Sequence, residues 1–188
     1  MTQPVLRTER LTLQPLRADH LEHLVELDSD PEVLRYLYGR ALSRAEVEAR
    51  MPSRLDPERA ADGRGFWCGF VGEEFVGWWL LVEPDRPEKG DPGDGVLGYR
   101  LRRKWWRQGL ASEGSRELLR YAFVGLDLPR VTAETMAVNE GSRAVMRSIG
   151  MTYWHTFHED FEDPLPGIEH GEVVYAISRD EWNQSGGV

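Results

Sequence analysis

The chain has 188 residues, of which 40% are hydrophobic and 29% charged, a composition typical of a folded globular protein. Its formal net charge is -9, so a general affinity for nucleic acid is not expected, whereas cationic substrates such as amines would be attracted. Acidity of this kind also serves solubility alone, and composition leaves both interpretations open.

The single cysteine, Cys68, cannot form a disulfide within the chain, and we expect it to be a core residue. No apolar run approaches the roughly 20 residues that would span a membrane. The first sixteen residues lack a basic region followed by an apolar one, so no signal peptide is predicted. A cytoplasmic location is expected. No segment resembles a linker, so we expect one domain over residues 1–188.

The first third of the chain predicts one strand followed by helices. Residues 11–16 alternate apolar and polar side chains, as a strand does. Asp19 is expected to cap a helix, and a second short helix is expected from Pro31. The sequence Ser43-Arg44-Ala45-Glu46 has the form of a capping box and predicts the start of a third helix, which Pro52 and Pro57 would interrupt.

The middle of the chain predicts a hairpin and a third strand. Residues 66–71 and 75–82 are rich in aromatic and β-branched side chains, and a Gly-Glu-Glu turn separates them. A loop rich in Pro, Gly and charge is expected over 83–93, and residues 95–101 read as a further strand.

The last part predicts a helix over 110–124, a strand over 130–138, a helix from Asn139 to Gly150, and two strands over 152–161 and 173–178. This order of elements predicts a mixed α/β fold with a largely antiparallel sheet and one strand–helix–strand crossover.

The junction between the strand at 95–101 and the next helix is the most informative segment. The first turn of a helix has unpaired backbone N–H groups and the positive end of the helix dipole, and together they bind phosphate. Gly109 and the small Ala111 would let a ligand approach the backbone. A solvated basic loop before an ordinary helix is the alternative, and neither a dinucleotide nor a Walker motif is present. The turn adds four positive charges, from Arg102, Arg103, Lys104 and Arg107.

The six residues Trp106-Arg107-Gln108-Gly109-Leu110-Ala111 resemble the cofactor motif of the GNAT acetyltransferases, Q/R-x-x-G-x-G/A. The tryptophan at the first position departs from that motif and is similar to the RimJ/RimL-like branch, which modifies the N-termini of ribosomal proteins. Three further segments resemble the same branch: residues 6–13 (LRTERLTL), Ser112-Glu113, and the closing YAI and EW of residues 175–177 and 181–182. The resemblance covers nearly the whole chain.

This resemblance implies the GNAT fold, a mixed and mostly antiparallel sheet of six to seven strands flanked by helices. A splayed strand pair, at the strand that ends Tyr99-Arg100-Leu101, would hold acyl-CoA. Acetyl-CoA is the implied co-substrate, and no metal is expected, since His20 and His23 have no evident third ligand. The implied cofactor contacts are Leu101, Arg102, Arg107, Gln108, Gly109, Leu110, Ala111, Ser112, Asn139, Ser142 and Arg147.

The chemistry implied is attack of an amine on the thioester. Many family members use a Tyr seven residues after the Asn to protonate the leaving thiolate, but that position is Met146 here, and Ser142 is the replacement that the branch suggests. Asn139 also suits a plain helix cap, and the Ser142 hydroxyl also suits a solvent-facing position.

For the general base, the resemblance to the RimL-like branch implies Glu159 or Asp160, and we choose Glu159. Asp160 would lie on the opposite face of an extended strand, His158 is a titrating neighbour, and Glu134 is the second choice. Each of these is equally well interpreted as an exposed charge. Trp67, Trp78 and Trp79 fit either packing or an acceptor pocket.

The expected acceptor is a protein N-terminus or another primary amine. The alternatives are a small-molecule amine, such as a polyamine, an aminoglycoside or an amino-acid derivative, and a catalytically silent acyl-CoA sensor. Donors other than acetyl-CoA, such as succinyl-CoA, are also compatible with the sequence. A homodimer is a compatible assembly, and neither nucleic acid nor membrane is an expected partner.

Overall fold

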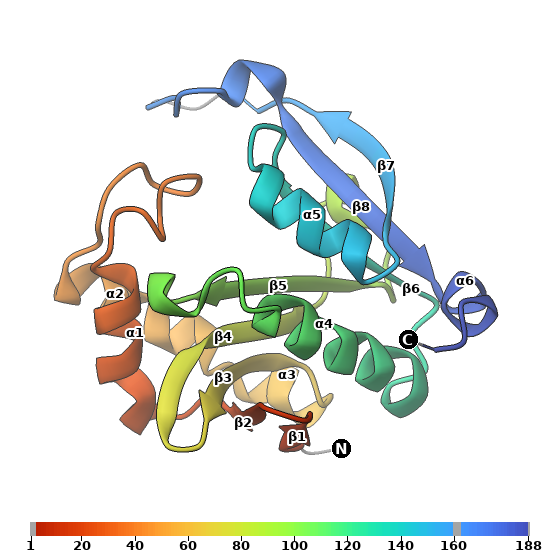
Figure 1. Ribbon diagram of the computed structural model, residues 1–188, viewed down its shortest axis with the longest axis horizontal. Helices are drawn as coiled ribbons and strands as arrows, with labels where there is room; N and C mark the ends of the chain where they lie inside the picture. Colours follow the sequence, from red (N-terminus) through yellow and green to blue (C-terminus); the bar gives the residue numbers. More distant parts are fainter. Residues whose placement is uncertain (1–2, 160–162, 188) are drawn as a thin grey trace.

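The computed structural model in Figure 1 describes residues 3–159 and 163–187. Its centre is a sheet of eight strands in the order β1-β2-β3-β4-β5-β6-β8-β7. The strands are β1 (Leu6–Arg7), β2 (Thr12–Pro15), β3 (Gly65–Val71), β4 (Glu74–Val82), β5 (Gly95–Leu101), β6 (Arg130–Met136), β7 (Thr152–Phe157) and β8 (Glu172–Ser178). The helices are α1 (Leu21–Asp28), α2 (Arg44–Arg54), α3 (Pro57–Ala61), α4 (Leu110–Arg120), α5 (Glu140–Ser148) and α6 (Arg179–Gln184).

The mixed, mostly antiparallel architecture confirms the predicted fold class. The sheet has one strand more than the upper end of the expected range, because Leu6–Arg7 pairs with β2 as a two-residue edge strand. β5 and β6 form the parallel pair, and α4 is the crossover between them.

The parallel pair opens soon after it starts. Gly95 pairs with Val131 and Val96 with Thr132, and the described part of the chain gives β5 no later partner on β6. The far end of β5 therefore keeps an unpaired edge, while its other edge stays paired with β4 as far as Leu101. In Figure 1, β7 and β8 run away from β5 at a steep angle, with α5 beside them. This opening is the splayed strand pair that the resemblance implied.

Two hydrophobic clusters cover the two faces of the sheet. One joins Trp79 of β4 to residues of α4 and α5, and the other joins Trp78 to residues of α1 and α2. Neighbouring strand residues point to opposite faces, so the two tryptophans serve different layers. Gly114 lets α4 lie against β4, because a Cβ there would come within 2.5 Å of the Trp79 ring.

Several helix boundaries follow local chemistry. The capping box at Ser43 is confirmed, with the Ser43 side chain accepting from the N–H of Glu46 and the Glu46 side chain accepting from the N–H of Ser43. The expected break at Pro57 is also confirmed, since Pro57 opens α3 with Asp56 as its cap. The expected break at Pro52 is wrong, because α2 continues through this residue and ends two residues later.

Other boundaries differ from expectation. Asp19 lies inside a 3-10 turn (Ala18–His20) that precedes α1, so it does not cap that helix. The segment after Pro31 forms turns rather than a helix. The helix expected over 110–124 ends as α4 at Arg120 and continues as a π-helical turn (Tyr121–Gly125).

At the C-terminal side, β6 ends at Met136 and β7 at Phe157, so both strands are shorter than expected.

Among the helices that the structure describes, none has the length and apolar character needed to cross a bilayer.

Candidate functional site

The start of α4 is built around Gly109, which is the N-cap residue with a φ of +79°. This left-handed conformation suits glycine and leaves the first turn of α4 without a capping side chain. The preceding loop closes on itself, since the Trp106 indole donates to the Leu101 carbonyl at 2.8 Å and the Gln108 amide donates to the Lys104 carbonyl at 2.8 Å. The tryptophan in the first position of the motif thus has a structural role.

The N-terminal segment anchors this loop. Arg10 donates to the Gln108 carbonyl at 2.9 Å and forms an ion pair with Glu113 at 2.5 Å, while the Thr8 hydroxyl donates to the same carboxylate at 2.5 Å. Burial would raise the pKa of Glu113, but hydrogen bonds from Thr8 and Arg10 outweigh it and hold the pKa below its usual value. Segments that are a hundred residues apart in sequence therefore fix one loop.

The four basic residues of the turn are not equivalent. Arg102 pairs with Glu26, Arg103 with Asp30 at 3.2 Å, and Lys104 with Glu74. Arg107 is exposed, has a φ of +58°, and has no polar partner among residues 3–159 and 163–187. Of the four charges expected at this loop, Arg107 alone is left for an anion. A non-glycine residue held in this conformation is a common feature of functional loops.

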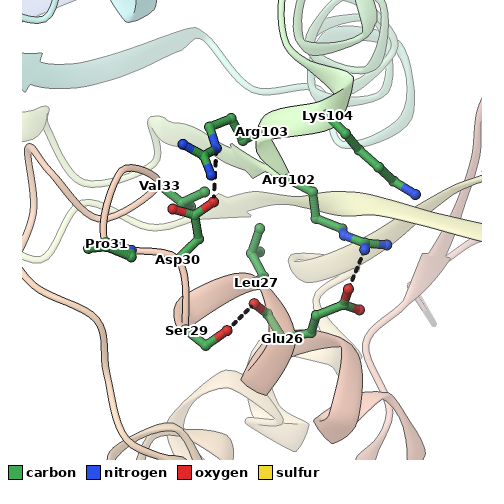
Figure 2. Close-up of a pocket in the computed structure, with 9 residues that line it drawn as sticks. All are labelled: Glu26, Leu27, Ser29, Asp30, Pro31, Val33, Arg102, Arg103 and Lys104. Atoms are coloured by element: carbon green, nitrogen blue, oxygen red, sulfur yellow. Dashed lines mark hydrogen bonds and ion pairs between the residues drawn. The ribbon is translucent and has the colours of Figure 1, made fainter.

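Figure 2 shows the first two of these ion pairs from the side of α1. They border a groove of about 500 Å³ between the C-terminal end of α1 and the loop after β5. Its lining includes Glu26, Asp30 and Pro31 on one side and Arg102, Arg103 and Lys104 on the other.

The start of α5 carries the second expected group of residues. The Asn139 side chain accepts from the N–H of Ser142 at 3.2 Å and donates to Thr135 at 2.9 Å, so it has the plain capping role. The two helices meet where the Ser112 and Ser148 hydroxyls lie 2.8 Å apart. This contact brings the first turn of α4 beside α5.

Tyr99 is a residue that sequence reasoning missed. Its hydroxyl lies 3.0 Å from the Ser142 hydroxyl and 3.2 Å from the Ser142 carbonyl oxygen. Burial raises the pKa of Tyr99 to about 12, so the phenol stays protonated at neutral pH. Leu97, Tyr99 and Leu101 are two residues apart along β5 and so share one face of the sheet. The two leucines indicate that this face is the one covered by α4 and α5, and this pattern could have placed Tyr99 there. Met146, seven residues after Asn139, is buried in the core.

The remaining expected contacts differ in what they can offer. The side chains of Leu101 and Leu110 are buried in the core, so only their backbone could meet a ligand. Ala111 accepts a hydrogen bond at its carbonyl from Trp79 at 3.4 Å. Arg147 is half exposed, contacts the Tyr175 hydroxyl at 3.4 Å and lies 3.6 Å from Glu140.

Two of the candidate bases, Glu134 and Glu159, belong to one charged cluster on the face of the sheet opposite α4 and α5. Arg86 pairs with Glu159 and lies 3.5 Å from Glu134, which is 2.7 Å from Lys89. Glu172 of β8 completes this cluster. Burial, with a contribution from the Glu134 charge, raises the pKa of Glu172 to about 7.

The strand register expected for Glu159 is wrong, because β7 ends at Phe157 and Glu159 follows it in a non-strand segment. Alternation along a strand therefore does not orient this residue. Asp160 lies outside the described residues.

Two other side-chain groups have structural roles. Cys68 is buried, and burial raises the pKa of its thiol to about 12, so it remains a protonated core residue as expected. The His20 and His23 rings lie 6.2 Å apart and both contact Phe70. Within the described residues, no three His, Cys, Asp or Glu side chains gather in a way that could hold a metal ion.

A helix that opens at a glycine beside a splayed strand pair matches the family that the sequence resembles. The family model described as "Acetyltransferase (GNAT) domain" matches residues 10–152, so the chain belongs to the GNAT family and is an N-acetyltransferase. Members of this family use acetyl-CoA.

A relative in Aspergillus fumigatus is 42% identical over 184 residues, which cover 96% of this chain and 78% of the relative. It is named "FsC-acetyl coenzyme A-N(2)-transacetylase".

Two solved structures share the fold. The RimL ribosomal L7/L12 α-N-protein acetyltransferase in complex with coenzyme A has a TM-score of 0.74 and 21% identity, covering 96% of this chain and 99% of that one. The spermidine N-acetyltransferase of Vibrio cholerae in complex with CoA and spermine also has a TM-score of 0.74, with 15% identity, covering 94% and 99%.

Proposed function

We propose that the chain transfers an acetyl group from acetyl-CoA to a primary amine by direct attack in a ternary complex. The observation that carries this proposal is the position of the α4 N-terminus, which one loop connects to the unpaired end of β5. A cofactor with its pyrophosphate at the helix would thus have its thioester arm in the gap between β5 and β6.

The proposed cofactor site is largely backbone. The N–H groups of Gly109, Leu110, Ala111 and Ser112 would meet the pyrophosphate, and the free guanidinium of Arg107 would add a charged contact. Arg102 is already engaged by Glu26, so Leu101 and Arg102 would contribute through their main chain. Gln108 holds the loop, and Asn139, Ser142 and Arg147 would border the arm from α5.

The unpaired edge of β5 would also serve the reaction. Its free backbone N–H groups can stabilise the oxyanion that forms when the amine attacks the thioester carbonyl. As the C–N bond forms and the C–S bond breaks, Ser142 would give its proton to the departing thiolate and regain a proton from solvent once the products leave. Tyr99, which stays protonated, would hold the Ser142 hydroxyl in position.

The proton of the amine would go to the carboxylate cluster on the opposite face. Glu159 remains our first candidate for the base. Arg86 links it to Glu134, which is on β6 at the border of the gap, and Glu172 shares the same surroundings. The raised pKa of Glu172 falls in the range that suits a base at neutral pH.

The acceptor is supported only as a class. The name of the Aspergillus fumigatus relative specifies one nitrogen, N2, of an acceptor abbreviated FsC. We infer an acceptor that is recognised at one defined amine nitrogen, which a small molecule or a protein N-terminus could supply. The cytoplasmic location, the single domain over the full chain and the homodimer stay predictions.

The first prediction concerns cofactor binding. Acetyl-CoA should raise the Tm of the wild-type protein by mass action. In Arg107→Ala we expect a roughly tenfold weaker Kd, since a hydrogen bond to a charged group contributes about 1.5–3 kcal/mol. Lys104→Ala is the matched control, because Lys104 is engaged by Glu74. Equal effects of the two variants would argue against the phosphate site.

Gly109→Val is a less useful test of the same site, since a φ of +79° would strain valine and destabilise the fold.

The second prediction concerns the leaving group. Ser142→Ala should lower kcat by a factor on the order of 10²–10⁴, with a smaller effect on KM. Tyr99→Phe should also lower kcat, but less, because it removes only the support of Ser142. Tyr121→Phe is the control, since this buried hydroxyl donates to Gly63 at 2.9 Å, away from the site. A wild-type kcat in Ser142→Ala would contradict the proposal and leave Ser142 as an ordinary residue of the first turn of α5, without a role in catalysis.

The third prediction concerns the base. A carboxyl group cannot accept a proton below its pKa, so kcat/KM should fall as the pH drops through that value. Glu159→Gln should lower kcat/KM and move the pH optimum upward, while Glu169→Gln, an exposed residue, should behave like wild type. If the wild-type limb is centred near pH 7 and disappears only in Glu172→Gln, the base is Glu172 and the assignment of Glu159 is wrong.

A further inference from the structure

A buried group of charges lies between the sheet and helices α1 and α2. Asp28 is fully buried, and its carboxylate lies 2.5 Å from Arg100 of β5 and 3.4 Å from Arg54 of α2. Both arginine side chains are only 9% exposed. Two guanidinium groups thus share one carboxylate, and among the residues that the structure describes the group carries one uncompensated positive charge.

The same group contains hydrogen-bond donors without acceptors. Arg54 Nη1, Arg100 Nε and the Trp78 indole N–H are buried and have no hydrogen-bond partner within the described chain. The two guanidinium carbons lie 6.0 and 5.0 Å from the centre of the Trp78 ring, so the two arginines and the tryptophan form one cluster. Burial lowers the pKa of Arg54, and the neighbouring Arg100 lowers it further. Buried donors are normally paired, so this site lacks an oxygen acceptor.

The site lies at the gap between β5 and β6, on the side away from α4 and α5. Arg100 follows Tyr99 on the stretch of β5 that has no partner on β6. The Tyr99 side chain points toward Ser142 of α5, so Arg100 points to the opposite face. If the cofactor enters from the α4 side, the acceptor must approach the thioester from this opposite face. The lining of the groove in Figure 2 includes Leu27 and Ser29, the two sequence neighbours of Asp28.

We propose that Arg54, Arg100 and Trp78 bind an oxygen of the acceptor, so that the substrate is an amine with a carboxylate or carbonyl group close to the reacting nitrogen. This inference rests on the proposed function and deepens it. A carboxylate would balance the extra charge, and either kind of oxygen would accept from the unpaired donors. An amine without such a group would leave all three donors unsatisfied and is expected to be a poor substrate.

The test compares three acceptors in which the amine stands on the same four-carbon chain and only the group beside it differs: norvaline with a carboxylate, norvalinamide with an amide and butylamine with neither. Thiol release from acetyl-CoA gives kcat/KM for each. A carbonyl group beside the amine also lowers the pKa of that amine, so kcat/KM is calculated for the unprotonated amine in each case. On that basis we expect norvaline or norvalinamide to exceed butylamine by about tenfold or more, the factor that loss of a hydrogen bond to a charged group implies. The better of the two then shows whether the bound oxygen is a carboxylate or a carbonyl. Equal use of butylamine would overturn the proposal.

Two variants test the assignment to these residues. Arg54→Met leaves Arg100 and Asp28 as a balanced pair, so it should keep or raise the Tm while the preference over butylamine falls toward one. Trp78→Phe keeps an aromatic ring but removes the unpaired N–H, and it should reduce the preference. Its smaller side chain in this buried position is also expected to lower the Tm. Arg50→Met, one turn earlier on α2, should keep the preference. A preference that survives Arg54→Met would contradict the proposal.

Binding is measured as well, so that slow turnover does not hide the result. With CoA present, norvaline or norvalinamide should raise the Tm of the wild-type protein, and the rise should be lost in Arg54→Met. If neither compound raises the Tm and neither is acetylated in preference to butylamine, the oxygen site is wrong. Failure of the proposed function gives a different result: acetyl-CoA itself would not raise the Tm, and no amine would release thiol.

Discussion

The separation of β5 from β6 after two paired residues is the constraint on which the site depends. A continuous sheet would satisfy every backbone group of β5 internally. The separation leaves N–H and C=O groups free along one edge, next to a helix N-terminus that also has free N–H groups. The donors at the helix can bind the pyrophosphate of the cofactor, and those along β5 can bind the thioester. The two faces of the gap carry different side chains, with Tyr99 and Ser142 on one face and Arg100 on the other.

Charge pairing decides which residues remain available for ligands. The turn before α4 is strongly basic in sequence, but Glu26, Asp30 and Glu74 neutralise three of its residues, and Arg107 has no ion-pair partner in the described part of the chain. The reverse holds around Asp28, where one carboxylate serves two arginines and leaves a positive excess. The run of basic residues in the sequence therefore points to the turn before α4 as an anion site. The charges around Asp28 give no such signal in the sequence, because Asp28, Arg54 and Arg100 come from distant elements.

Much of the fold could be predicted from the sequence, because its signals are local. β5 matches the expected strand, Ser43 and Asn139 cap helices as expected, and Gly109 opens α4. The side-chain contacts of the site were less accessible. Tyr99 meets Ser142 across 43 residues of sequence, and Arg86 brings Glu134 and Glu159 together from three separate segments. The early end of β7 depends on its pairing with β8 and moved Glu159 off the strand.

The most direct test of the central claim is a crystal structure of the protein with CoA. The account predicts the pyrophosphate on the backbone N–H groups at the start of α4 and the arm between β5 and β6. The sulfur should lie within hydrogen-bond reach of the Ser142 hydroxyl, about 3–4 Å for a sulfur acceptor. CoA bound in the groove of Figure 2, or with its sulfur directed away from the gap between β5 and β6, would contradict the account.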